Sequence, residues 1–116
     1  MTLKEKIKSS NAVIGIIGLG YVGLPLSIVF LEKGFKVIGF DIDDSKLSTL
    51  NQGQSYLNHI SYDFMPAIKK NLFKTTSSFK QISNVDVVII CVPIKISPFP
   101  DLKSDIICKE LFFIVS

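Results

Sequence analysis

The chain has 116 residues, 47% of them hydrophobic and 20% charged, and its formal net charge is +3. A chain of this length buries about 60–70% of its unfolded surface, which is enough for one compact core but not for several domains. The basic residues are dispersed except for Lys4, Lys6 and Lys8, so we predict no nucleic-acid partner. Cys91 and Cys108 are too few for a disulfide framework and are not spaced as metal ligands, which favours a reducing cytoplasm.

Residues 12–31 form an uncharged, mostly apolar stretch directly after the lysine-bearing N-terminus, a profile that is also typical of a membrane signal anchor. Glycines and Pro25 interrupt this stretch at spacings that a membrane helix does not require, and another strand-like segment follows at once. We therefore expect a soluble protein with no membrane partner. A small membrane-anchored protein is the alternative, which recovery of the chain in a detergent-free soluble fraction would exclude.

Strand and helix signals alternate along the first half of the chain. Residues 1–11 predict a short polar helical extension, with Leu3 and Ile7 on one face. The continuous β-branched run 13–17 predicts a parallel strand that is buried on both faces, and 21–33 predicts a helix. A glycine-rich turn separates this strand from this helix.

Capping residues define the ends of the first two helices. Pro25 falls in the first turn of the helix, where its missing N–H costs nothing, and Gly34 closes the same helix as a C-cap. Either Asp43 or Asp44 is placed to N-cap the next helix, which is expected to end near residue 51.

The remaining elements continue this alternation of strand and helix. Buried strands that alternate with helices predict an α/β fold, namely a Rossmann-type doubly wound parallel sheet. We expect an incomplete version with about four to five strands, in a domain over 12–116 that follows the extension 1–11. The other predicted elements are a strand over 35–40, a loop over 55–61, a strand over 72–76, a turn or short helix over 79–82, and a central parallel strand over 85–92. The pattern over 62–70 is that of a helix interrupted by Pro66, and we expect the helix after this proline.

Gly18, Gly20 and Gly23 form a G-x-G-x-x-G pattern between the first strand and the first long helix. Gly18 permits the tight turn out of the strand, Gly20 lets the backbone approach a pyrophosphate, and Gly23 lets the helix lie close to the strand. The N–H groups and the dipole of the helix N-terminus then stabilise the phosphate charge. Such a pattern also arises from strand–helix packing alone, but its position after a strand and before a helix favours dinucleotide binding.

Asp41 follows the second strand, eighteen positions after Gly23. A carboxylate near this spacing accepts hydrogen bonds from the adenosine ribose hydroxyls and repels the additional phosphate of NADP, so NAD is the predicted cofactor. Lys46 lies about one helical turn further along. It either contacts the adenosine end of the cofactor or is simply solvated.

Four further residues lie near the predicted site or carry reactive side chains. Val92 and Pro93 end the predicted fourth strand at the carboxyl edge, where open α/β sheets bind ligands. The loop beginning at Pro93 is therefore expected to face the cofactor. The alternative is that Pro93 only terminates the strand. Cys91 ends an apolar run and is interpreted as a buried, inert thiol rather than a nucleophile. His59 is the only histidine, and we expect it on the surface or in a loop.

Beyond these patterns, the residues themselves resemble the UDP-glucose/GDP-mannose dehydrogenase family over about residues 3–93. Other Rossmann dehydrogenases share the glycine pattern but fit residues 21–26 less well. The segments that carry the resemblance are 13–26 (VIGIIGLGYVGLPL), similar to the opening of the family, 34–43 (GFKVIGFDID), similar to its second strand, and Cys91-Val92-Pro93, similar to the end of its fourth. Residues 53–56 (GQSY) and the N-terminal extension look most like the branch that oxidises UDP-N-acetylhexosamines at C6.

The resemblance implies a two-step, four-electron oxidation of a sugar C6 alcohol to a carboxylate with two molecules of NAD, in polysaccharide biosynthesis. It implies a UDP-sugar partner only where a catalytic domain complements this chain. Carried over by residue, the resemblance implies that Gly18, Leu19, Gly20, Tyr21 and Val22 line the pyrophosphate, that Asp41 and Lys46 lie at the adenosine ribose, and that Val92 and Pro93 approach the nicotinamide half.

The chain departs from the family pattern after the fourth strand. Where the family continues from Cys-Val-Pro into Thr-Pro, this chain has Ile94-Lys95. Pro100-Asp101-Leu102 resembles a later family element, after a connection that looks shortened. The resemblance to the family is therefore weakest on the nicotinamide side of the site.

The family's catalytic cysteine, its assisting lysine and asparagine, and its nucleotide-sugar-binding domain lie beyond the matched segment, so we expect NAD binding without turnover. Residues 111–116 predict an apolar strand that leaves the sheet with an exposed edge, as truncation, a frameshift after Pro93 or a split gene would produce. The alternative function is a non-catalytic module that binds NAD or a partner dehydrogenase subunit. A homo-oligomer or a complementing chain is compatible with either function.

Overall fold

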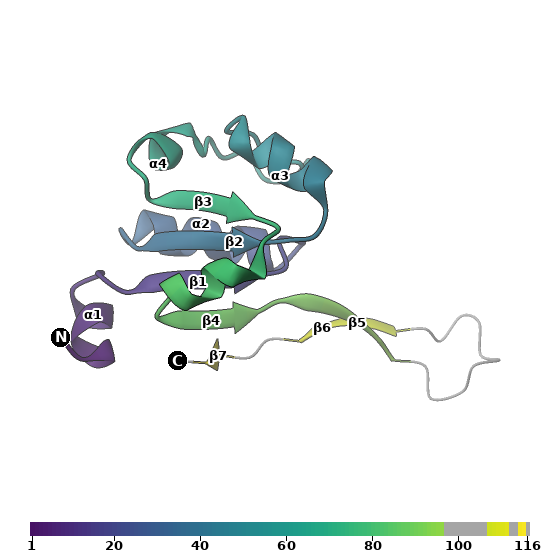
Figure 1. Ribbon diagram of the computed structural model, residues 1–116. Helices are drawn as coiled ribbons and strands as arrows, with labels where there is room; N and C mark the ends of the chain where they lie inside the picture. Colours follow the sequence, from purple (N-terminus) through teal and green to yellow (C-terminus); the bar gives the residue numbers. More distant parts are fainter. Residues whose placement is uncertain (97–106, 112–113, 116) are drawn as a thin grey trace.

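A computed structural model describes the backbone of residues 1–96, 107–111 and 114–115 and the side chains of residues 1–91. Its main sheet has five strands in the order β3-β2-β1-β4-β7, and the first four are parallel (Figure 1). This is the α/β fold that the alternation of elements predicts. The strands are β1 (Val13–Ile17), β2 (Lys36–Phe40), β3 (Phe73–Thr76), β4 (Val87–Ile90) and β7 (Ile114–Val115).

The four parallel strands end in register at one edge of the sheet. Ile17 at the end of β1 pairs with Phe40 of β2 on one side and with Ile90 of β4 on the other. Phe40 in turn pairs with Thr76, the last residue of β3. The residues that follow these strands therefore emerge side by side, at the carboxyl edge where ligands bind in open α/β sheets.

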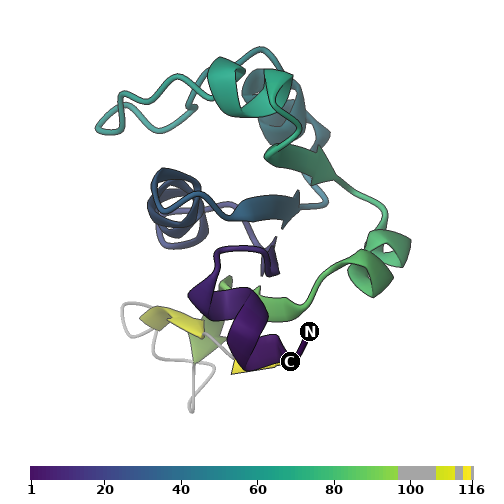
Figure 2. The same cartoon turned by 90° about the vertical axis from the view of Figure 1, so that its left-hand side faces the viewer.

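Helices connect the parallel strands across both faces of the sheet. Helix α2 (Gly23–Glu32) packs on β1 and β2, whereas α3 (Asp44–Asn51) and α4 (Met65–Lys69) pack against β3. The 3₁₀ helix η1 (Phe79–Asn84) leads from β3 to β4. Figure 2 shows α2 and η1 on opposite sides of the sheet, as a doubly wound arrangement requires.

The helix boundaries follow the capping residues closely, with one difference. Helix α2 begins at Gly23 and not at residue 21, because residues 20–22 form the turn that leads into it. Gly34 closes α2 in the left-handed region at φ 86°. Asp43, rather than Asp44, caps α3, since its Oδ1 accepts a hydrogen bond of 3.0 Å from the Ser45 amide.

The core lies between the sheet and these helices and is built from the apolar runs of the sequence. Strands β1 and β2 have buried residues at successive positions, which is typical of parallel strands covered on both faces. The residues below 2% exposure are Ala12, Ile16, Leu19, Leu24, Ser27, Val37, Phe40, Leu50, Phe64 and Cys91. Among them, Ser27 satisfies its hydroxyl by donating to the Gly23 carbonyl at 2.8 Å.

The carboxylate of Asp86 connects helix α1 (Leu3–Lys8) to strand β1 by hydrogen bonds. Asp86 accepts a hydrogen bond of 2.9 Å from Lys6 Nζ through Oδ1 and one of 2.8 Å from the Val13 amide through Oδ2. Leu3 packs against the core, whereas Ile7 is 45% exposed, so the two residues do not contribute equally to the apolar face that we predicted.

We expect Asp86→Ala to lower the free energy of unfolding by about 1–3 kcal/mol at neutral pH, because it removes both hydrogen bonds. The hydrogen bond from the Val13 amide, and then the one from Lys6, hold the pKa of Asp86 below its usual value. A lowered folded-state pKa gives stability that is present above the ordinary aspartate pKa of about 4 and is lost as pH falls further. Urea unfolding at pH 7 and pH 3 measures this, and an equal difference between wild type and variant at both pH values would contradict the account.

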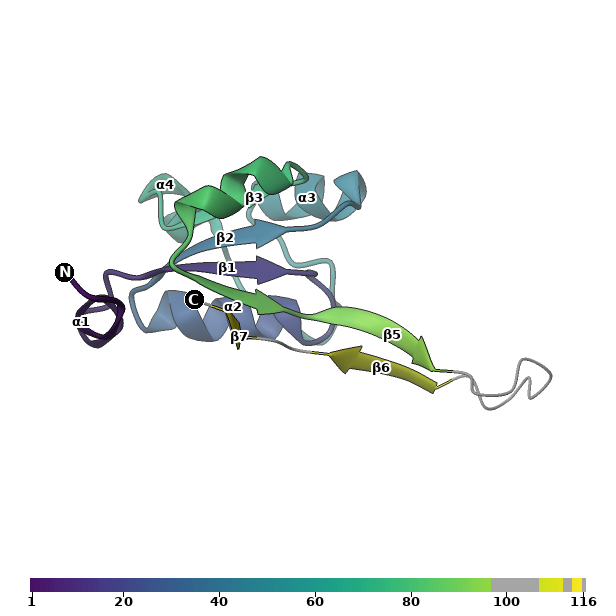
Figure 3. The same cartoon turned by 60° about the horizontal axis from the view of Figure 1, so that its bottom comes forward.

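The apolar run over 85–92 is not one strand, which corrects the prediction. Strand β4 ends at Ile90, and a separate antiparallel pair follows, formed by β5 (Val92–Ile96) and β6 (Ile107–Leu111). Figure 3 shows this pair extending from the carboxyl edge, away from the main sheet. Pro93 lacks the N–H that an inner strand with two neighbours would need, which gives a physical reason for the break.

Only part of the strand predicted over 111–116 is found: Ile114–Val115 form β7, which runs antiparallel to β4, whereas Leu111 is the last residue of β6. Val115 pairs with Val88 and Ile114 with Ile89, so β7 covers the outer side of β4 and makes the sheet mixed. Residues 100–102, which resemble a later family element, lie outside the described residues. No helix among the described residues is long and apolar enough to span a membrane.

Candidate functional site

A glycine turn connects β1 to α2 at the carboxyl edge of the sheet. Gly18 has φ 92°, in the left-handed region that glycine adopts without strain, and its amide donates to the Phe40 carbonyl at 2.8 Å. The next residue, Leu19, has its side chain fully buried. The turn is thus held to β2 by its backbone and anchored in the core by one side chain.

The start of α2 lies unusually close to this turn. A Cβ atom on Gly23 would lie 1.8 Å from the Gly18 carbonyl oxygen, far below the 3.0 Å that Cβ contacts respect. No described side chain caps the N-terminus of α2, where Val22 occupies the cap position. The Leu24 amide donates to the Gly20 carbonyl at 3.1 Å, and Pro25 has no N–H. The groups left for an anion are therefore the amides of the turn that leads into α2 and the positive end of the helix dipole.

Asp41 lies directly after β2 and beside the glycine turn. Its Oδ2 accepts a hydrogen bond of 2.9 Å from the Leu19 amide, and its Oδ1 accepts one of 2.9 Å from the Asp43 amide. The carboxylate is 11% exposed, so both oxygens are fixed in orientation. A carboxylate offers about four acceptor positions, which leaves two for hydroxyl groups of a ligand.

Lys46, on the first turn of α3, lies next to Asp41. Its Nζ is 4.0 Å from Asp41 Oδ2 and 5.5 Å from the centre of the Tyr56 ring. Both contacts are at the long end of their kind, and the lysine side chain remains 34% exposed. At this distance and exposure, such an ion pair contributes little to stability, which leaves the ammonium able to reorient toward a ligand.

These residues line one cleft of about 990 Å³ at the carboxyl edge of the sheet. A cleft of this size suits a ligand as large as a dinucleotide. Two residues of its wall could not be placed there from the sequence: Ile42 is 81% exposed and Phe79 43% exposed, although both are large and apolar. The lining residues are Ile17, Gly18, Leu19, Gly20, Tyr21, Phe40, Asp41, Ile42, Asp43, Lys46, Tyr56, Leu57, Phe79 and Cys91.

The loop over 55–61 reaches from α3 to the glycine turn. His59 stacks on Tyr21 with ring centres 5.9 Å apart and planes inclined by 8°. The expectation that His59 lies in a loop is confirmed, but its contact with Tyr21 had no signal in the sequence, because the two residues are distant along the chain. The same applies to Tyr56, which lines the cleft from this loop.

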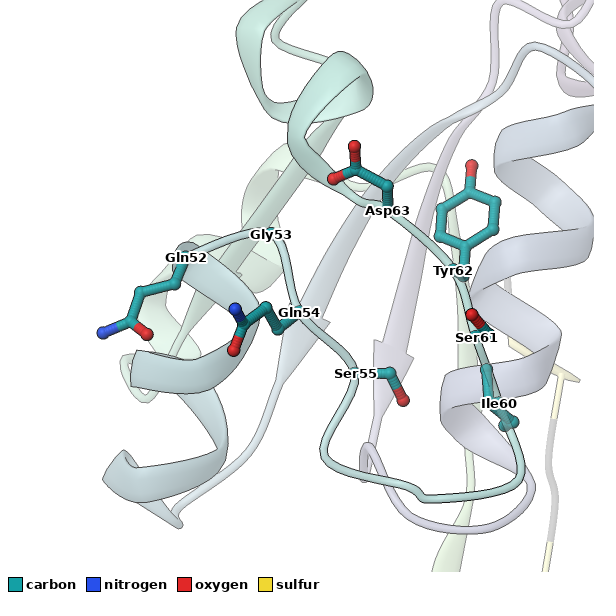
Figure 4. Close-up of a pocket in the computed structure, with 8 residues that line it drawn as sticks. All are labelled: Gln52, Gly53, Gln54, Ser55, Ile60, Ser61, Tyr62 and Asp63. Atoms are coloured by element: carbon teal, nitrogen blue, oxygen red, sulfur yellow. The ribbon is translucent and has the colours of Figure 1, made fainter.

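A second hollow, of about 530 Å³, lies on the other side of this loop (Figure 4). Its polar side chains diverge rather than point toward a common centre. Two of them already serve local turns, since Asp63 Oδ1 accepts from the Met65 amide and the Ser55 hydroxyl donates to the Leu57 carbonyl. This hollow therefore has the character of a surface depression and not of a binding site.

The residues at the end of β4 are placed differently from the prediction. Cys91 is 1% exposed, which confirms the expected buried thiol. Val92 and Pro93 begin strand β5, not a loop, and their side chains lie outside the described part of the chain. Among the described residues, no group of three His, Cys, Asp or Glu side chains could hold a metal ion.

The parallel order β3-β2-β1-β4, with a glycine turn after β1 and an acidic residue after β2, defines a Rossmann-type dinucleotide-binding domain. The model of the NAD-binding domain of the UDP-glucose/GDP-mannose dehydrogenase family matches residues 12–106. The chain belongs to this family, and its cofactor is NAD.

Individual relatives agree with this assignment. Protein CapL of Staphylococcus aureus is 36% identical over 94 residues, which cover 79% of this chain and 21% of CapL. UDP-N-acetyl-D-mannosamine dehydrogenase of Methanococcus aeolicus is 33% identical over 107 residues, or 90% of this chain and 24% of the relative. The solved structure of the UDP-N-acetyl-mannosamine dehydrogenase Cap5O from S. aureus has a TM-score of 0.64 at 26% identity, covering 84% of this chain and 23% of that one. The chain thus spans less than a quarter of the length of these relatives.

Proposed function

We propose that this chain supplies the NAD site of an enzyme that oxidises the C6 alcohol of a UDP-sugar to a carboxylate. One observation carries the proposal: the glycine turn that leads into the N-terminus of α2 and the carboxylate of Asp41 line a single cleft. This arrangement supports the recognition of a phosphate and a ribose in one cleft, as a dinucleotide requires. The hollow of Figure 4 is lined by neither the glycine turn nor Asp41.

Each half of the adenosine diphosphate would meet complementary chemistry in this cleft. The turn formed by Gly18, Leu19, Gly20, Tyr21 and Val22, with Gly23 at the start of α2, would line the pyrophosphate, whose charge the helix N-terminus stabilises. Because the Gly18 and Leu19 amides already donate to Phe40 and Asp41, the hydrogen bonds to the phosphates would come from the amides that follow them. The remaining acceptor positions of Asp41 would bind the ribose hydroxyls. Lys46, 4.0 Å from that carboxylate, would contact the same end of the cofactor.

The apolar wall of the cleft would bind the adenine ring. Ile42 and Phe79 are exposed although their side chains are large and apolar, and both line the cleft. Phe79 is held in place by Phe40, with ring centres 5.8 Å apart. Covering these side chains with a flat aromatic base would remove apolar surface from water, which favours binding.

The substrate and reaction are proposed for the whole enzyme of which this domain would be part. NAD, when bound, accepts a hydride from the sugar carbon. Relatives that carry the name UDP-N-acetyl-D-mannosamine dehydrogenase support a UDP-N-acetylhexosamine as the substrate class. This chain would contribute the groups that hold and orient the cofactor, and further polypeptide would bind the sugar. We place this enzyme in the cytoplasm.

A second candidate function is a non-catalytic module that binds NAD or a partner dehydrogenase subunit. The two candidates differ in what happens when UDP-sugar is added with NAD. Formation of NADH by the chain together with a complementing dehydrogenase domain would favour the enzyme, whereas NAD binding with no gain in turnover would favour the module.

Calorimetric titration of the purified chain with NAD and with NADP tests the proposed function. We expect saturable binding of one NAD per chain and at least about tenfold weaker binding of NADP, because its additional phosphate would approach the Asp41 carboxylate. A folded chain that binds neither cofactor would overturn the proposal. Equal affinity for both would overturn the role given to Asp41.

A further inference from the structure

One polar group beside the cleft has no partner among the described residues. The hydroxyl oxygen of Tyr56 is buried and makes no hydrogen bond with any described residue. Leaving such a group unpaired destabilises the fold, so buried hydroxyls in proteins nearly always have a partner. The Tyr56 ring lines the same cleft as Asp41 and Lys46.

The position of Tyr56 is set by two ring contacts of its loop. The Lys46 ammonium lies 5.5 Å from the centre of the Tyr56 ring, and three residues further along His59 stacks on Tyr21. The loop thus contacts both the glycine turn and α3. Tyr56 and Leu57 of this loop line the cleft together with Asp41.

We propose that the Tyr56 hydroxyl is a second ribose ligand, which donates a hydrogen bond to an adenosine ribose hydroxyl whose own proton is donated to Asp41. This inference rests on the proposed function and adds a residue to it. A ribose hydroxyl both donates and accepts, so it can bridge a carboxylate and a tyrosine. The carboxylate alone can only accept, and the tyrosine supplies the missing donor.

The protonation state of Tyr56 suits this role. Burial, and after it the negative charges of Asp41 and Asp43, raise the pKa of the Tyr56 hydroxyl above its usual value. The group therefore keeps its proton at neutral pH and remains a donor. Because the hydroxyl is covered in the structure, contact with a ligand requires a small shift of the loop. The ring contacts that hold the loop are weak enough to permit this shift.

The test compares Tyr56→Phe with wild type in calorimetric titrations with NAD. The variant keeps the ring beneath Lys46 and removes only the hydroxyl. We expect the Kd for NAD to rise roughly 3- to 10-fold, with an unchanged or higher Tm because an unpaired buried group is lost. Tyr62→Phe is the matched control, since Tyr62 lines the other hollow, and its Kd for NAD should equal that of wild type.

An NAD analogue whose adenosine ribose lacks both hydroxyls identifies the partner of Tyr56. With this analogue, wild type and Tyr56→Phe should bind equally, because the hydrogen bond is absent in both cases. Equal binding of NAD itself by wild type and Tyr56→Phe would overturn the inference, as would a loss of the same size with the analogue. Failure of the wild type to bind NAD would instead overturn the proposed function.

Discussion

Gly23→Ala should abolish measurable NAD binding and destabilise the domain. The added Cβ would lie 1.8 Å from the Gly18 carbonyl oxygen, and both partners of this clash belong to the backbone or are fixed to it. Relief requires α2 to move away from β1, which distorts the turn that binds the pyrophosphate. We expect a loss of about 2–3 kcal/mol, equivalent to a Tm lower by roughly 10–20 °C in a chain of this size. Thermal unfolding and calorimetric titration with NAD measure the two effects.

Gly34→Ala is the matched control for this substitution. Gly34 has φ 86°, so alanine is strained there by about 1–2 kcal/mol, but its Cβ would have no atom within 4 Å. Gly34 also lies at the opposite end of α2 from the cleft. This variant should lose stability while keeping its affinity for NAD. If Gly23→Ala lost stability but bound NAD as well as Gly34→Ala does, the close approach would not be needed for binding.

Asp41→Ala should weaken NAD binding about 10- to 100-fold and remove the preference for NAD over NADP. The loss corresponds to hydrogen bonds from ribose hydroxyls to a charged acceptor, worth about 1.5–3 kcal/mol. Lys46, released from its neighbour at 4.0 Å, then becomes a cation near the position of the NADP phosphate. NADP should consequently bind as tightly as NAD or more tightly. Parallel titrations with the two cofactors give the ratio of the dissociation constants.

Asp44→Asn separates a local contact from the general effect of charge. Asp44 is exposed on the first turn of α3 and does not line the cleft. Its replacement by asparagine removes one negative charge, as Asp41→Ala does, but leaves the cleft unchanged. We expect its preference for NAD to match that of wild type. A shift in preference as large as that of Asp41→Ala would mean that the electrostatic field, and not contact with the ribose, selects the cofactor.

Local sequence patterns predicted the fold well where a residue type strongly favours one conformation, as β-branched residues favour strands and glycine or aspartate favour helix ends. The β-branched run over 13–17 is strand β1 with the same boundaries, and Gly34 and Asp43 end and begin helices as their side chains dictate. Apolar periodicity was insufficient over 85–92, because a buried strand and the start of a hairpin have the same composition. There the missing N–H of Pro93 was the informative feature.

The site was predictable to the extent that it follows the chain. Gly18 and Asp41 each come directly after a strand, and parallel strands in register bring such residues together. Tyr56 and Phe79 could not be placed from the sequence, because they reach the cleft from a loop and a 3₁₀ helix whose direction depends on tertiary packing.

Amide chemical-shift mapping would show directly whether NAD binds at the carboxyl edge of the sheet. A uniformly ¹⁵N-labelled chain would be titrated with NAD, and each shifted amide assigned to its residue. If NAD binds in the cleft, we expect the largest chemical-shift changes at the glycine turn, the first turn of α2, Asp41 and Tyr56, with few changes in α1. Saturable shifts confined to the hollow of Figure 4, or a folded chain whose amides do not respond to NAD, would contradict binding in the cleft.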